Sequence, residues 1–199
     1  MFDKTIHNPS GCAISGIFSK KGKLTGGKTI IDSIRVMHDR SNGLGGGFAG
    51  YGIYPDNKND YAFHLFYDEI KFPGIQQRTE EFIKDHFEIV NLSRIPTRRH
   101  PAITNKPLIM RYFLQPNMDR LRHSQLDEKE YVRRYVVRIN SDEYAGAFVF
   151  SSGKNMGIFK GVGFPEDIGE FYELEKYSAY CWTAHGRYPT NTPGWWGGA

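Results

Sequence analysis

The chain has 199 residues, and 26 Lys and Arg against 22 Asp and Glu give a formal net charge of +4. This length suits one domain, or one domain with a large insertion, and a core that needs no disulfides. No apolar run reaches the roughly 18 residues of a membrane-spanning helix, and the first residues lack the features of a secretory signal. Two cysteines, Cys12 and Cys181, exclude a disulfide framework and favour a reducing cytoplasm.

Alternating Val, Ile, Phe and Tyr residues predict six strands, because a period of two is the strand signal. These strands are expected at 12–18, 48–54, 61–67, 108–114, 145–150 and 178–185. Helices are expected after Thr25 as the capping residue, at 76–88, at 127–139 and after Pro165. Residues 95–107 are rich in proline and charge and predict a loop.

The order of these elements predicts an α+β domain built on antiparallel sheet. A strand–helix insertion is expected to interrupt it at about 70–177. The last residues, from Trp195 to Ala199, are apolar and glycine-rich and form no capped helix or charged tail. We therefore expect the domain to be incomplete at this end.

Three segments contain residues that can carry chemistry. Cys12 stands before the first strand, either as a small core residue or as a nucleophile. The glycine-rich residues 41–47 follow a helix and precede a strand, which is the wrong order for a phosphate-binding loop and by itself predicts a tight connection. Arg187, followed by Thr190, forms a donor group suited to a carboxylate, or alternatively lies in a surface turn.

Together the three segments resemble the class II glutamine amidotransferases, and within them the glutaminase domain or subunit of glutamate synthases. The family's opening Cys-Gly-Ile-x-Gly is similar to Cys-Ala-Ile-Ser-Gly from Cys12 onward. His-Asp-Arg at 38–40, with the glycines that follow, resembles the second block. The most specific match is His-Gly-Arg-Tyr-Pro-Thr-Asn-Thr at 185–192. The resemblance covers about 12–66 and 178–196.

The resemblance implies the four-layer αββα sandwich of the N-terminal-nucleophile hydrolases. It implies that Cys12 attacks the side-chain amide of L-glutamine, that Arg187 and Thr190 bind the substrate carboxylate, and that Arg40 shapes the pocket. The released ammonia would pass to a synthase subunit or domain, and the reaction needs no cofactor. The default acceptor is the one used for glutamate synthesis. Another glutamate-derivative synthase, such as N-methylglutamate synthase, is an alternative.

Two departures from the family pattern lead to further expectations. The family's cysteine is the mature N-terminus, so residues 1–11 are expected to be a leader that is removed. The family forms its oxyanion hole from an Asn-Gly pair downstream of the arginine block, and none of the twelve residues after Arg187 (199 − 187) forms such a pair. Asn42-Gly43 lies on the wrong side of that block. The glutaminase domain is therefore expected to be incomplete.

Other classes of function are less well supported. Arginines in 98–100, 120–123 and 133–138 could contact a nucleic acid, as the isoelectric point near 9.0 permits, but interleaved acidic residues favour solvated helix faces. The seven histidines show no paired spacing of a metal site. We expect no nucleic-acid, membrane or metal partner. A family member that has lost catalysis and acts as a binding subunit remains an alternative to an enzyme.

Overall fold

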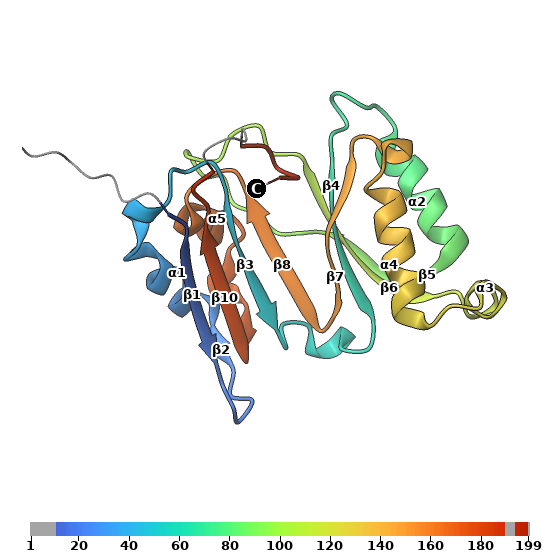
Figure 1. Cartoon of the computed structure of the whole chain (residues 1–199), viewed down its shortest axis with the longest axis horizontal. Coiled ribbons are helices and arrows are strands. Elements are labelled where there is room, and N and C mark those ends of the chain that lie inside the picture. The colour runs from blue at the N-terminus through green and yellow to red at the C-terminus, as the bar shows by residue number, and fades with distance from the viewer. Residues whose placement is uncertain (1–10, 190–193, 199) are drawn as a thin grey trace, which may run out of the picture. The chain divides into compact units, whose positions relative to one another are not determined.

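The computed structural model describes residues 11–189 and 194–198 of the chain (Figure 1). The chain divides into two compact units. The first unit comprises Met1–Phe48, Arg98–Thr104 and Phe159–Ala199, and the second comprises Ala49–Thr97 and Asn105–Ile158. Cys12, Arg40 and Arg187 belong to the first unit.

A four-stranded sheet with the strand order β1-β10-β3-β8 supplies the longer strands of the first unit, and the end of β3 and the beginning of β8 fall in the residue ranges of the second. The strands of this sheet are β1 (Ala13–Phe18), β10 (Cys181–Gly186), β3 (Gly46–Tyr51) and β8 (Met156–Gly161). Helices α1 (Gly27–Arg35) and α5 (Pro165–Phe171) pack against each other and against β10. Smaller elements are the β2–β9 pair (Thr25–Gly26 and Ser178–Ala179), η1 (His38–Arg40) and η4 (Leu174–Lys176).

The two faces of this sheet differ, because successive side chains of a strand point to opposite sides. Trp182 of β10 is fully buried on the helix side, and its Nε1 donates a hydrogen bond to the Thr25 carbonyl at 2.8 Å. Ser15 of β1 likewise meets Ser33 of α1, with their Oγ atoms 2.5 Å apart. On the other face Ile14 is 73% exposed. One face of the sheet therefore packs against the helices, and the opposite face is exposed at Ile14.

The second unit contains an antiparallel sheet with the order β5-β6-β4-β7. Its strands are β4 (Tyr61–Tyr67), β5 (Phe87–Arg94), β6 (Leu108–Pro116) and β7 (Ala147–Lys154). Helices α2 (Ile75–His86) and α4 (Glu128–Ile139) pack on this sheet and enclose a core rich in aromatic side chains. Shorter elements are α3 (Met118–Ser124), η2 (Pro55–Asn57) and η3 (Asp142–Tyr144).

The structure confirms the expected mixture of helices with antiparallel sheet, and it confirms the loop at 95–107. The four-layer sandwich and the insertion at 70–177 stay predictions. Thr25 does not cap α1: Gly26 precedes the helix without a side-chain cap, and Thr25 belongs to β2. Strands β5 and β8 were not predicted, because a register shift after Ile89 interrupts β5 and two of the six residues of β8 are glycines, which weakens the period-two signal.

A buried histidine in the second unit allows a prediction about stability. His64 of β4 is fully buried, and its Nδ1 donates to the Ile158 carbonyl at 2.7 Å because a carbonyl can only accept. Its Nε2 then accepts from the Tyr54 hydroxyl at 2.9 Å. Burial, with a smaller contribution from the Arg111 cation, lowers the pKa of His64 to about 3. The folded protein therefore holds this histidine neutral, whereas the unfolded chain protonates it near its ordinary pKa of 6.5.

Because the folded-state pKa is depressed, the contribution of His64 to stability is fully present above pH 6.5 and is lost as the pH falls towards 3. The expected loss is about 1.4 kcal/mol per pH unit within that range. In urea unfolding the variant His64→Gln should lack this component and show a shallower fall in the free energy of unfolding. Equal slopes for the two proteins would contradict the prediction.

Candidate active site

The candidate nucleophile and the candidate carboxylate ligand lie at the same end of the first sheet. Ala13 of β1 pairs with Gly186 of β10, so Cys12 and Arg187 are the next residues on two neighbouring antiparallel strands. Residues opposite each other in such strands have Cα atoms about 4.5–5.5 Å apart. Strands β10 and β8 finish where β1 and β3 begin (Figure 1). Cys12 and Arg187 are therefore close enough to contact one small ligand.

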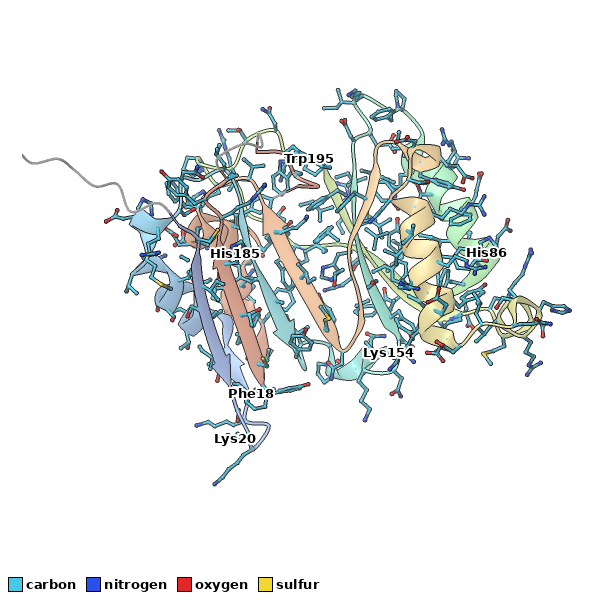
Figure 2. All side chains as sticks on the ribbon, in the orientation of Figure 1. Phe18, Lys20, His86, Lys154, His185 and Trp195 are labelled. Carbon is cyan, nitrogen blue, oxygen red and sulfur yellow. The ribbon has the colours of Figure 1, made fainter. Side chains whose placement is uncertain are left out.

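Both residues also belong to the face that points away from the helices. Gly186 packs on the helix side, since a Cβ there would lie 3.2 Å from Cγ of Pro165 in α5. Alternation along the strand then assigns Arg187 and His185 to the opposite face, with Ile14 and Cys12 beside them on the neighbouring strand. Figure 2 shows His185 at this end of the sheet and Phe18 at the other.

Cys12 is exposed, so it is not the buried core residue that its position before a strand could also indicate. The side chain of Arg40 lies close to Gly11, the residue before Cys12, since a Cβ built on Gly11 would stand 3.0 Å from Arg40 Nη2. Arg40 belongs to η1. Three chain segments that are distant in sequence thus bring Cys12, Arg40 and Arg187 to one neighbourhood.

The glycine-rich segment is fastened to the end of β10. Ser41 Oγ donates to the Arg187 carbonyl at 3.0 Å, and the Arg187 amide donates to the Gly45 carbonyl at 2.9 Å. Asn42 Nδ2 donates to the Pro189 carbonyl at 3.3 Å. Gly43, with a φ of +72°, allows close approach to an aromatic ring at position 164. The glycine-rich segment and the segment that carries Arg187 are therefore joined by hydrogen bonds.

A further contact anchors the turn that carries Arg40. His38 Nδ1 lies 2.5 Å from Oε1 of Glu166, whose side chain is buried in the first turn of α5. The His38 ring also stacks on Phe164, with centroids 4.0 Å apart. The sequence motif included His38 without indicating a role for it. In the structure it holds η1 against the start of α5.

Lys160 lies near Arg187 and is absent from the three sequence motifs. Its Nζ donates to the Gly197 carbonyl at 2.6 Å, and Arg187 Nη1 donates to the Gly198 carbonyl at 2.5 Å. Burial, together with the nearby Arg187 cation, lowers the pKa of Lys160 to about 8. The same two causes lower the pKa of His185. If the alternation of Gly157, Phe159 and Gly161 had been recognised as a strand, Lys160 would have been assigned to the face opposite to that of the buried Phe159.

Four further expectations concern Thr190, Cys181, metal binding and membrane-spanning helices. Thr190 lies outside the described residues. Cys181 pairs with Phe18 at the far end of the sheet from Cys12. Among residues 11–189 and 194–198, no three His, Cys, Asp or Glu side chains come together as metal ligands. No helix in the same described ranges is long and apolar enough to span a bilayer.

The arginines considered for nucleic-acid contact are interleaved with acids in three dimensions as well. Arg138 is hydrogen-bonded through Nε and Nη2 to Glu143, at 2.9 and 2.7 Å. Arg133 pairs with Glu130 at 2.6 Å. A hollow of about 590 Å³ in the second unit is lined by both signs of charge. Its lining residues are Arg78, Glu81, Phe82, Asp85, His86, Arg120, Arg138, Glu143 and Tyr144. These side chains form a surface of mixed charge within that unit, where acidic residues lie among the arginines.

Comparison with known proteins gives two findings. The family described as glutamine amidotransferases class-II matches residues 55–199, a range that contains Lys160 and Arg187. An uncharacterized protein of Archaeoglobus fulgidus is 44% identical over 189 residues, covering 94% of this chain and 49% of that protein. The chain thus spans about half the length of the curated relative it matches.

Proposed function

Because this chain belongs to the class II glutamine amidotransferases, we propose that it releases ammonia from L-glutamine through a thioester on Cys12. The observation that carries the proposal is the placement of Cys12 and Arg187 on adjacent strands, at one end and one face of one sheet. A nucleophile and a carboxylate ligand at this separation suit a small amino acid with a carboxylate at one end and an amide at the other.

The proposed reaction has two steps. The Cys12 thiolate attacks the side-chain amide carbon of glutamine, a carbon–sulfur bond forms, the carbon–nitrogen bond breaks, and the nitrogen takes a proton and leaves as ammonia. Water then attacks the γ-glutamyl thioester, the carbon–sulfur bond breaks, and the thiol and glutamate are released. All atoms come from glutamine, water and the enzyme.

We further propose that removal of residues 1–11 makes Cys12 the working N-terminus. A free α-amine has an ordinary pKa of roughly 7.7–8.0 and can accept the thiol proton directly or through water. The amide nitrogen of an internal residue cannot do so. The exposure of Cys12 is compatible with cleavage at this bond.

The substrate ligands in this proposal are Arg187 for the α-carboxylate, with Thr190 as an added donor. The guanidinium offers paired donors that match two carboxylate oxygens. Arg40 shapes the pocket next to the nucleophile, as its closeness to Gly11 supports. Because Ser41 and the backbone at position 45 bind the Arg187 main chain, the glycine-rich segment fixes the backbone from which this side chain extends.

The ammonia is proposed to pass to a partner synthase subunit or domain, with glutamate synthesis as the first candidate. Another glutamate-derivative synthase, such as N-methylglutamate synthase, is the alternative acceptor. The A. fulgidus relative is an uncharacterized protein and favours neither acceptor. A binding subunit without catalysis is the rival outcome, and the experiment below separates it from an enzyme.

The test is covalent labelling of the full-length protein from its native host with diazo-oxo-norleucine, an electrophile that resembles glutamine. We expect one adduct per chain, on Cys12, that excess glutamine suppresses. Intact mass of the labelled protein should also show the loss of residues 1–11. Cys181 serves as the internal control and should stay unmodified. The absence of an adduct would favour the binding subunit, and a labelled chain that retains its leader would contradict the processing step alone.

A further inference from the structure

We propose that Lys160 is a second binding residue for the α-carboxylate of glutamine, acting beside Arg187 on the same face of the first sheet. This inference rests on the proposed function, because it takes glutamine as the substrate. It adds to the site a cation from β8, a strand that none of the three sequence motifs includes.

The strands assign Lys160 and Arg187 to one face. Phe159 packs against Tyr172 beyond α5, with ring centroids 5.4 Å apart, so the next residue of β8 points the other way. Arg187 follows the helix-facing Gly186 and also points away from the helices. Across the order β1-β10-β3-β8, the sequence of groups is Cys12, then Arg187, then Lys160. A glutamine whose amide lies at Cys12 would therefore direct its carboxylate towards the two cations.

Strand β3 lies between the strands of these two cations, and at Gly47 it has no side chain that would collide with β8. A Cβ on Gly47 would stand 2.9 Å from Cβ of Lys160 and 2.5 Å from the Phe159 carbonyl oxygen. Any larger residue at position 47 would displace the Lys160 side chain or the backbone of β8. The glycine at position 47 therefore leaves room for the Lys160 side chain on this face of the sheet.

The two cations already bind a pair of neighbouring oxygens. Lys160 Nζ donates a hydrogen bond to the Gly197 carbonyl at 2.6 Å, and Arg187 Nη1 donates one to the Gly198 carbonyl at 2.5 Å. These oxygens belong to consecutive residues, whose Cα atoms are about 3.8 Å apart. Lys160 and Arg187 therefore direct their donors towards neighbouring oxygen atoms, as the binding of one carboxylate by both cations requires. A carboxylate carries a full negative charge, so it attracts two cations more strongly than neutral carbonyl groups do and competes well for the same donors.

The charges around Lys160 make its contribution dependent on pH. On β10, Arg187 and His185 share its face, and Cys12 lies beyond them on the neighbouring strand. On β3, residues 46–49 have no titratable side chain. From the helix side, the Tyr172 hydroxyl donates to the Lys160 carbonyl and does not reach the ammonium group's face. Burial and the Arg187 cation lower the pKa of Lys160 to about 8, so the free site loses this charge above that pH.

The experiment measures glutaminase kinetics of the full-length protein and its Lys160→Gln variant. The expected result at pH 7 is a KM for glutamine about tenfold higher in the variant, equivalent to 1.4 kcal/mol, with kcat changed by no more than about twofold. Lys160→Arg should restore most of the affinity. Lys176→Gln is the matched control, because it removes the same charge from an exposed lysine of η4 that pairs with Glu173.

The pH profile and a second substrate identify the group that Lys160 contacts. In the unmodified protein the KM for glutamine should rise between pH 7 and about pH 9, because a lysine with a pKa near 8 loses its proton there, whereas Lys160→Gln and Lys160→Arg should each lack this component. With glutaminamide, which has an amide in place of the α-carboxylate, Lys160→Gln should leave KM unchanged.

The outcomes separate this inference from the proposed function. An active enzyme whose KM for glutamine is the same in Lys160→Gln as in the unmodified protein would overturn the role of Lys160 and leave the Cys12 reaction intact. An equal effect on glutamine and glutaminamide would also overturn it, because Lys160 would then act on something other than the carboxylate. A protein without ammonia release or labelling at Cys12 would instead refute the proposed function.

Discussion

Replacement of Cys12 by alanine is expected to abolish ammonia release from glutamine in the full-length protein. The thiolate forms the covalent intermediate in the proposed reaction, and alanine offers no atom that could replace it. Removal of a catalytic nucleophile leaves only the catalysis due to binding and oxyanion stabilisation, so the loss in kcat should be roughly 10⁴-fold or more. Ammonia release at saturating glutamine is the measurement.

Cys181→Ala is the matched control for this result. Cys181 is the other cysteine of the chain, partly buried at the start of β10 and opposite Phe18, at the far end of the sheet. This variant should keep most of the activity. Circular dichroism and thermal unfolding of both variants should show the same fold as the unmodified protein. Full activity in Cys12→Ala, or loss of activity only in Cys181→Ala, would refute the nucleophile assignment.

Truncation of Arg187 is expected to raise the KM for glutamine by about 30-fold or more. Loss of one partner of a charge pair in a partly desolvated site costs roughly 2–5 kcal/mol, and 1.4 kcal/mol corresponds to tenfold. Arg187 is partly buried, and its main chain is held by Ser41 and by the backbone of the glycine-rich segment. The variant Arg187→Ala therefore removes the guanidinium without removing those main-chain hydrogen bonds.

Two comparisons make the Arg187 experiment specific. Arg187→Lys should recover only part of the affinity, because an ammonium cannot reproduce the paired donors of a guanidinium. Arg35→Ala is the control in the same unit: it removes an exposed arginine of α1 that pairs with Asp32 and Glu170 on the helix side of the sheet. If Arg187→Ala leaves the KM for glutamine unchanged, the carboxylate ligand lies elsewhere.

Local sequence patterns were sufficient for many of the elements. Alternating β-branched and aromatic residues placed the strands 61–67 and 108–114, and β4 and β6 lie inside one antiparallel sheet and are buried over most of their length. The apolar positions 30, 31 and 34 placed α1, since they form one buried face. The motif residues Cys12, Arg40 and Arg187 were likewise found from the sequence, because each stands in a short run of distinctive residues.

Patterns were insufficient where a contact with a distant segment decides the local structure. The Thr25 side chain does not cap α1, because its residue pairs with β9 and its carbonyl accepts from Trp182, which is 157 positions away. Residues 87–94 form β5 although a register shift interrupts their alternation, since hydrogen bonds to β6 stabilise the strand.

The site shows the same division between local pattern and tertiary structure. Sequence by itself determined that a cysteine, a glycine-rich segment and an arginine are present, and the resemblance connected them to one chemistry. Tertiary structure alone decided that Ser41 holds the main chain of Arg187, 146 positions away, and that Lys160 shares the face of Cys12. The physical reason is that strand pairing and side-chain alternation set which groups meet, and both depend on partners far along the chain.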